Sequence, residues 1–220
     1  MLNKEIRIFN FETRAEQNET HGTFITGMPI VFDQTTDLGW CTERIDPEAL
    51  RDTDLRDVRF LIGHNTGMIP LARSRNNNEN STMQMVVTDE GMKIRVDLDT
   101  ENNSEARALY SAVKRGDISG MSFMFTVDTD KDSWEDIESE KPHRTIMSIQ
   151  RVFEVSAVAF PAYEGTSIEA ASEDAALDSA RASLESARKR LAEERALAAE
   201  TERRRAALER LEELQRRVRA

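Results

Sequence analysis

The sequence lacks the features of a disulfide-stabilised or membrane-spanning protein. Its single cysteine, Cys41, excludes an intramolecular disulfide framework and is typical of a reducing compartment. No apolar run approaches the roughly 20 residues needed to cross a bilayer, and the N-terminus lacks the long apolar core of a secretory signal. We therefore expect a soluble, cytosolic protein.

Metal ligands are also scarce, and acidic residues outnumber basic ones. The three histidines, His21, His64 and His143, share no ligand spacing with the cysteine, so the sequence predicts no metal and no cofactor. The formal net charge is −11, and residues 173–220, with 12 Lys/Arg and 11 Asp/Glu, contribute almost none of it. The acidic remainder argues against nucleic-acid binding and indicates a basic partner or simple solubility.

Glycine and proline are absent after Gly165. From about Asp174 the chain is rich in alanine, glutamate, arginine and leucine, which predicts a long helix. Four of its apolar residues are seven apart and indicate a weak coiled coil or a partner-docking helix: Leu177, Leu184, Leu191 and Ala198. A solvated single helix held by Glu–Arg pairs is an equal alternative. We expect a compact domain over 1–163, a linker over 164–173 and a helical tail over 174–220.

The part before the linker alternates between short apolar segments and turns. Gly27 and Pro29 should interrupt a strand with a bulge, and Asp46 should begin a short helix. Gly91 closes a hairpin turn, and Gly116 ends a helix. The predicted elements are strands at 24–32, 58–62, 83–87, 92–98 and 144–160 and a helix at 103–114.

The segment 116–127 reads as a strand entered through a tight turn. Alternation puts Ser119 on one face with the aromatic residues and Ser122 on the other, between Gly120 and Met124. We therefore expect Ser119 to be buried and Ser122 to be accessible and rigidly held. Read alone, the segment also fits a half-buried strand with an ordinary solvent-facing serine.

Two further residues could complete a nucleophilic site with Ser122. His64 ends an apolar run over 58–63, and Glu154 opens another over 154–160. A serine, a histidine and a carboxylate at the ends or middles of three strands can converge as nucleophile, base and orienting group. The order along the chain does not decide this, because such sites are defined by geometry.

Taken together, the segments resemble the prohead maturation proteases of tailed bacteriophages, a serine peptidase family distantly related to the herpesvirus assemblins. The resemblance covers about residues 4–168. Two positions depart from it, since the family usually has glycine where this chain has Ala72 and Met124. Both could alter the groove, and neither removes a reacting group. The resemblance is carried by residues 25–32, 42–50, 57–65, 71–74, 116–123 and 153–163.

The resemblance implies an α+β fold, in which a mostly antiparallel, β-barrel-like protease domain with flanking helices precedes the long C-terminal helix. It implies a serine endopeptidase that cleaves scaffold and coat proteins, and itself, inside the assembling procapsid in the host cytoplasm. The implied partners are the phage major capsid and scaffolding proteins, with self-association through the tail as a further option. No nucleic-acid or membrane partner is expected.

The residue roles follow from the same resemblance. Ser122 would attack the scissile carbonyl, His64 would take its proton, and Glu154 would orient the imidazole. The assemblins use a second histidine as third member, and His143 is available, 21 residues after Ser122. His143 lies in a polar turn and ranks below Glu154, and His21 reads as a surface residue.

A non-enzymatic function is the competing interpretation. The chain would then be an internal scaffold or coat-binding assembly protein that acts through its coiled tail, with the folded domain as a docking module. Labelling of Ser122 by a serine-reactive fluorophosphonate distinguishes the two, because only the protease interpretation requires an activated hydroxyl.

Overall fold

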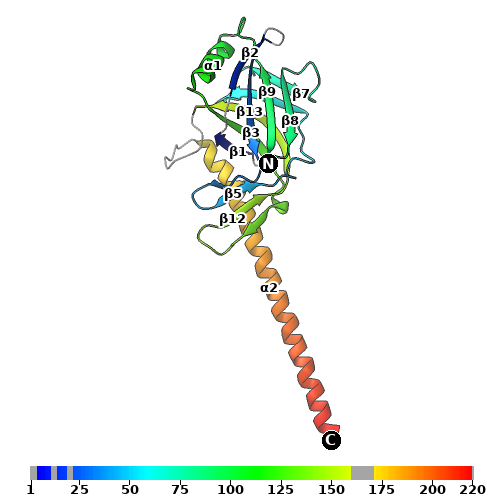
Figure 1. The fold of residues 1–220 in the computed structure, drawn as a ribbon. Helices are drawn as coiled ribbons and strands as arrows, with labels where there is room; N and C mark the ends of the chain where they lie inside the picture. The colour runs from blue at the N-terminus through cyan, green and yellow to red at the C-terminus, as the bar shows by residue number, and fades with distance from the viewer. Residues whose placement is uncertain (1–3, 11–13, 19–21, 160–170, 220) are drawn as a thin grey trace.

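Three β-sheets form the body of the protein, and one long helix projects from it towards the C-terminus (Figure 1). The structure is a computed structural model that describes residues 4–10, 14–18, 22–159 and 171–219. The central sheet contains, in spatial order, β1 (Glu5–Asn10), β10 (Gly120–Val127), β13 (Ile149–Val158), β6 (Asp57–Ile62) and β7 (Ala72–Arg75). Neighbours in this sheet are antiparallel except β13 and β6, which run parallel.

Two four-stranded sheets accompany the central one. The second sheet is ordered β2 (Arg14–Asn18), β3 (Gly22–Val31), β9 (Gly91–Asp97), β8 (Met83–Thr88). The third is ordered β11 (Ser133–Glu135), β12 (His143–Ile146), β5 (Thr42–Ile45), β4 (Thr36–Asp37). Each sheet has two edge strands, so the described part of the chain forms no closed barrel. The mixed α and β content is as expected, but the barrel-like arrangement is not confirmed.

The hydrophobic core joins the inner face of the central sheet to the second sheet. Met121, Phe123 and Phe125 alternate along β10 and have no exposed surface. They belong to one cluster with Ile25 of β3 and Ile94 of β9. Burying a side chain of this size stabilises the fold by about 1.5–3 kcal/mol. The opposite face of β10 is therefore the one on which polar residues are placed.

The second sheet confirms two predictions of local structure. The pairing of β3 with β9 shifts register between Gly27 and Ile30, which is the bulge expected there. Strands β8 and β9 form the predicted hairpin. At its turn, Gly91 has a φ of 148°, and a Cβ on it would lie 2.0 Å from the Ile30 carbonyl oxygen, so no larger residue fits.

Helix α1 (Ser104–Arg115) leads directly into β10 and has both ends capped. The Asn103 side chain accepts hydrogen bonds from the amides of Glu105 and Ala106, at 2.9 and 3.3 Å. Gly116 ends the helix in the left-handed conformation, as the sequence predicted. The helix buries Ala106, Leu109 and Val113.

Three local predictions were wrong. The segment 46–53 is a series of turns rather than a helix: the amides of Ala49, Arg51 and Thr53 donate to the carbonyls three residues earlier. The strand expected over 144–160 is two strands, β12 and β13, which belong to different sheets. Ser119 is exposed rather than buried, because β10 begins only at Gly120 and alternation does not extend beyond a strand. The segment between β10 and β12 contains the short 3₁₀ helix η1 (Thr129–Lys131) and β11.

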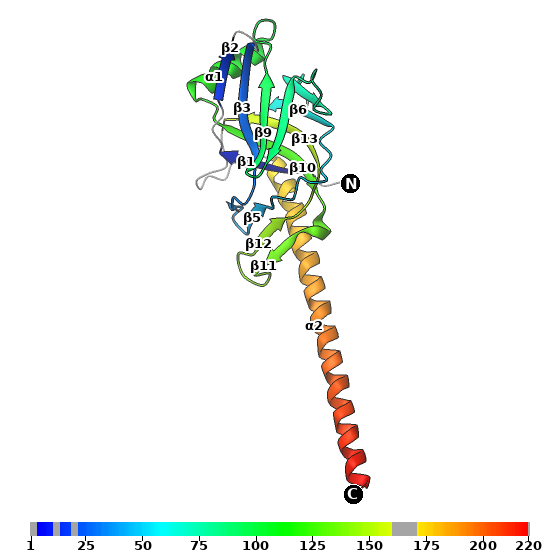
Figure 2. The same cartoon turned by 45° about the vertical axis from the view of Figure 1, so that its right-hand side comes forward.

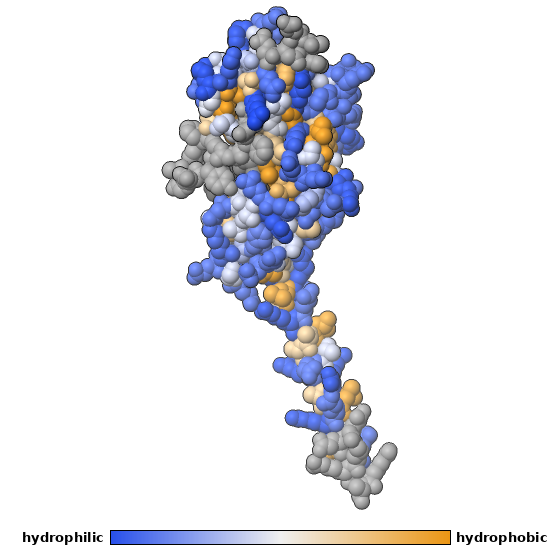
Figure 3. Space-filling model, viewed as in Figure 1, coloured by the Kyte–Doolittle hydropathy of each residue, from blue (hydrophilic) through white to orange (hydrophobic). Residues whose placement is uncertain are grey.

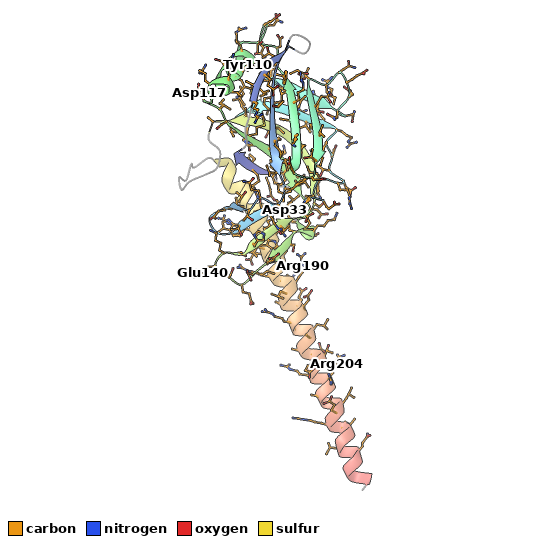
Figure 4. All side chains as sticks on the ribbon, in the orientation of Figure 1. Asp33, Tyr110, Asp117, Glu140, Arg190 and Arg204 are labelled. Carbon is orange, nitrogen blue, oxygen red and sulfur yellow. The ribbon has the colours of Figure 1, made fainter. Side chains whose placement is uncertain are left out.

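Helix α2 (Ala171–Arg219) lies against the body at its start and projects freely beyond it (Figure 2). Leu184 and Ala187 pack in a cluster with Cys41 and Trp134. Further along, apolar patches alternate with hydrophilic ones on the surface of the helix (Figure 3). The large apolar residues exposed there are Leu197, Leu208, Leu211 and Leu214. Arg204, labelled in Figure 4, pairs with Glu200 one turn earlier at 2.6 Å.

The long helix is as expected, whereas a coiled coil is not confirmed. The boundary at 163 and most of the linker at 164–173 lie outside the described residues, so the domain limits remain a prediction. No helix within the described ranges is long and apolar enough to cross a membrane.

A buried cluster of charges joins β1, the third sheet and α2. Arg144 of β12 is fully buried and contacts Glu5 of β1, Glu43 of β5 and Asp132, at 2.9, 2.8 and 2.5 Å. Arg7 of β1 pairs with the same two glutamates. Burial raises the pKa of Asp132 to about 6, although the charge of Arg144 acts in the opposite direction.

The same cluster also holds α2, through Ser183. Ser183 donates to an Asp132 carboxylate oxygen at 2.9 Å, and the Trp134 indole nitrogen donates to Ser183 at 3.0 Å. The docked part of the helix is therefore hydrogen-bonded as well as packed against the body.

Candidate active site

Ser122 lies in the middle of β10, on the face opposite the aromatic core residues. The registers of the central sheet place it opposite Ile8 of β1 and Ser156 of β13. This confirms the face predicted by alternation. The expected accessibility is wrong, because Ser122 has no exposed surface. Burial follows from its position inside the sheet, with a paired strand on each side.

His64 follows β6 in a tight turn with an uncommon backbone. Both Gly63 and His64 have positive φ angles, 57° and 58°, a region that residues other than glycine seldom adopt. Two amide hydrogen bonds tie the turn to β13: Gly63 donates to the Ala157 carbonyl and His64 to the Ser156 hydroxyl, each at 3.0 Å. The turn brings the imidazole Nε2 within 2.6 Å of the Ser122 hydroxyl oxygen.

Glu154 shares a face of the central sheet with Ser122. On β13 it lies two residues before Ser156, the residue paired with Ser122, so its carboxylate projects on the same side. One carboxylate oxygen lies 2.5 Å from His64 Nδ1, and the other accepts a hydrogen bond from Ser156 at 2.6 Å. The structure thus brings Ser122, His64 and Glu154 into one continuous chain of contacts.

Hydrogen-bond accounting indicates how protons can be arranged in this chain. A carboxylate only accepts, so in a neutral imidazole the contact with Glu154 places the hydrogen on Nδ1 and leaves Nε2 as an acceptor. The Ser122 hydroxyl has a single hydrogen and two acceptors within reach. One is His64 Nε2, and the other is the main-chain carbonyl oxygen of Arg7, at 2.7 Å. Donation to Nε2 is the arrangement that prepares the oxygen for attack.

The remaining candidates from the sequence lie elsewhere. His143 belongs to β12 in the third sheet, where its Nδ1 lies 2.8 Å from the Thr42 hydroxyl. His21 lies outside the described residues. Cys41 is buried, and burial raises the pKa of its thiol to about 12, so a thiolate nucleophile is not available there. Within the described ranges, no group of three or more His, Cys, Asp or Glu side chains is placed to hold a metal ion.

Two residues of the site, Ser156 and Arg7, were not anticipated from the sequence. Ser156 contacts both His64 and Glu154, and the Arg7 carbonyl contacts Ser122. Alternation could have indicated Ser156, because it lies two residues after Glu154 and therefore on the same face. The Arg7 contact has no sequence signal, since it is made by the main chain of a strand 115 residues away.

Two comparisons find known proteins that are similar to this chain. A profile described as Caudovirus prohead serine protease matches residues 9–179. The structure of the bacteriophage T4 capsid assembly protease, gp21, also matches, with 13% sequence identity and a TM-score of 0.40. That match covers 72% of this chain and 99% of the T4 chain. No curated protein matches the chain.

Proposed function

Because the chain belongs to the Caudovirus prohead serine protease family, we propose that it is a serine endopeptidase that uses Ser122, His64 and Glu154 to cleave capsid-assembly proteins. The observation that carries the proposal is the run of contacts from Ser122 through His64 to Glu154, at 2.6 and 2.5 Å. At these distances a base can accept the proton of the nucleophile, and a carboxylate can orient the base and stabilise its charged form.

In the proposed reaction, Ser122 attacks the scissile carbonyl carbon while His64 Nε2 accepts the hydroxyl proton. The imidazolium formed is stabilised by Glu154 through Nδ1. His64 then returns the proton to the leaving amine, and a water molecule repeats the sequence to release the acyl group from Ser122. For attack, the Ser122 hydrogen must point to Nε2 rather than to the Arg7 carbonyl.

Glu154 and His143 are the two candidates for the third member of the triad, and Glu154 is the one we propose. We expect Glu154→Gln to lower the rate of cleavage by about 10²–10⁴-fold, because the amide cannot stabilise the imidazolium. His143→Ala should stay within about threefold of the parent protein, since His143 contacts Thr42 in another sheet. The measurement is the rate at which a fluorophosphonate labels each full-length variant. The reverse ranking would assign the assemblin-like role to His143.

The substrates and partners proposed are the major capsid and scaffolding proteins of the procapsid, and the chain itself. The projecting part of α2 supports a docking role, because it exposes leucines without packing them against the body (Figure 3). We propose that this helix associates with a partner helix, or with a second copy, and so confines the protease with its substrates inside the shell. A scaffold function without catalysis remains the alternative.

Co-expression with the coat and scaffolding proteins of the same phage tests the function directly. We expect new termini on these proteins, mapped by mass spectrometry, and their absence when the Ser122→Ala variant replaces the parent. Shell assembly without new termini in either sample would support the scaffold interpretation instead.

A further inference from the structure

We propose that Ser156 is a positioning residue of the active site, whose hydroxyl holds the Glu154 carboxylate and the His64 main chain in their working arrangement. The proposal rests on the function proposed above and adds a residue to it. It concerns a side chain that does not touch the reacting atoms and acts through the two residues that it contacts.

Ser156 has the burial and the hydrogen-bonding capacity for this role. It lies on β13 between β10 and β6, opposite Ser122 on one side and Leu61 on the other, and has no exposed surface. Its hydroxyl donates to a Glu154 carboxylate oxygen at 2.6 Å and accepts from the His64 amide at 3.0 Å. One donor hydrogen and a free lone pair allow both bonds at once.

These bonds close a ring with the contact between Glu154 and His64. The ring runs from the His64 amide to the Ser156 hydroxyl, on to one oxygen of Glu154, and from its other oxygen back to His64 Nδ1. With one oxygen held by Ser156, the carboxylate is fixed in rotation and presents the other to the imidazole. The imidazole is fixed in turn, and its Nε2 faces Ser122.

The main-chain bond carries a separate part of the role. His64 adopts a left-handed conformation that is unfavourable for a residue with a Cβ, so surrounding contacts must maintain it. Of the two amide bonds that tie this turn to β13, Ser156 supplies the one made to a side chain. Loss of its hydroxyl would loosen both the backbone and the carboxylate. A displacement of about 1 Å in such a group can cost on the order of 10²-fold in rate.

The test compares Ser156→Thr with Ser156→Val in the full-length protein. Threonine and valine have nearly the same shape, and only threonine keeps a hydroxyl. We expect Ser156→Val to reduce the rate of fluorophosphonate labelling at Ser122 by about 10–100-fold, and Ser156→Thr to recover most of that loss. Ser74→Ala is the matched control, because Ser74 is equally buried in the same sheet and its hydroxyl has no partner. It should label within about twofold of the parent.

A second comparison separates positioning from stability. In a His64→Ala background, adding Ser156→Val should cause no further loss of rate, because the group that Ser156 positions is gone. Equal labelling of the Thr and Val variants would overturn the proposal, as would a Val variant that fails to fold while the Thr variant folds. Absence of labelling at Ser122 in the parent would instead refute the proposed function, so the two failures are distinguishable.

Discussion

Replacing Ser122 with alanine is expected to abolish peptide-bond cleavage while leaving the fold intact. The substitution removes the proposed nucleophile, and loss of a triad member in a serine protease typically costs about 10⁴–10⁶-fold in rate. The core packs on the other face of β10, through Met121, Phe123 and Phe125, so the change removes one hydroxyl and no core contact. Mass-spectrometric detection of new termini and the thermal unfolding midpoint measure the two effects separately.

Ser119→Ala is the control for this experiment, because Ser119 lies three residues earlier and is exposed. It should retain full activity. His64→Ala should be as inactive as Ser122→Ala, and the double variant no worse, since members of a catalytic unit are not additive. Independent multiplicative losses would contradict the pairing of these two residues. Cleavage by Ser122→Ala at the parent rate would remove Ser122 from the mechanism.

Replacing Arg144 with methionine is expected to destabilise the protein by about 3–5 kcal/mol. The change leaves three buried carboxylates, Glu5, Glu43 and Asp132, with Arg7 as the remaining cation of the cluster. A loss of this size is a large fraction of the roughly 5–15 kcal/mol by which domains are usually stable. Urea unfolding followed by tryptophan fluorescence measures it, since Trp134 is linked to the cluster through Ser183.

The loss of stability caused by Arg144→Met should also depend on pH. A carboxyl group whose pKa is raised by folding binds more protons in the folded state, so the free energy of unfolding falls as the pH rises from about 4 through that pKa. Asp132 is such a group, and without Arg144 its carboxylate loses its nearest cation. The difference between parent and variant should therefore be smaller at pH 5 than at pH 8.

Arg56→Met provides the matched comparison. Arg56 pairs with Asp54 at 2.9 Å, but its side chain is 78% exposed, so its removal should destabilise the protein far less than the removal of Arg144. If Arg144→Met costs no more than Arg56→Met, the buried cluster does not hold β1 and α2 against the third sheet in the way its contacts indicate.

Patterns of neighbouring residues in the sequence determine a large part of the fold. Alternation along 120–127 placed Ser122 on the face opposite the core, Gly116 ended the helix before it, and Gly91 turned the hairpin between β8 and β9. The lack of glycine and proline after Gly165 predicted the long helix. These predictions hold because side-chain alternation, helix capping and positive φ angles depend on a few neighbouring residues.

The same local reasoning failed where distant segments compete for the chain. Residues 144–160 read as one strand, yet Arg144 pairs in the third sheet with Glu43 of β5, a residue 101 positions away, while β13 enters the central sheet. The sequence predicted a buried Ser119 and an accessible Ser122, and the structure shows the reverse. Exposure depends on where β10 begins and on which strands lie beside it.

By itself, the sequence determined the candidates for the site, a serine in mid-strand, a histidine after one strand and a carboxylate within another, and the face of β10 on which Ser122 lies. Only the tertiary structure decided that they meet. Strands β6, β13 and β10 are adjacent in the sheet although far apart in sequence, and the left-handed turn at His64 directs the imidazole to Ser122. The tertiary structure also decided the contacts of Ser156, of the Arg7 carbonyl and of the charges around Arg144. Their partners are set by strand order, which arises from the packing of the whole domain rather than from any single segment.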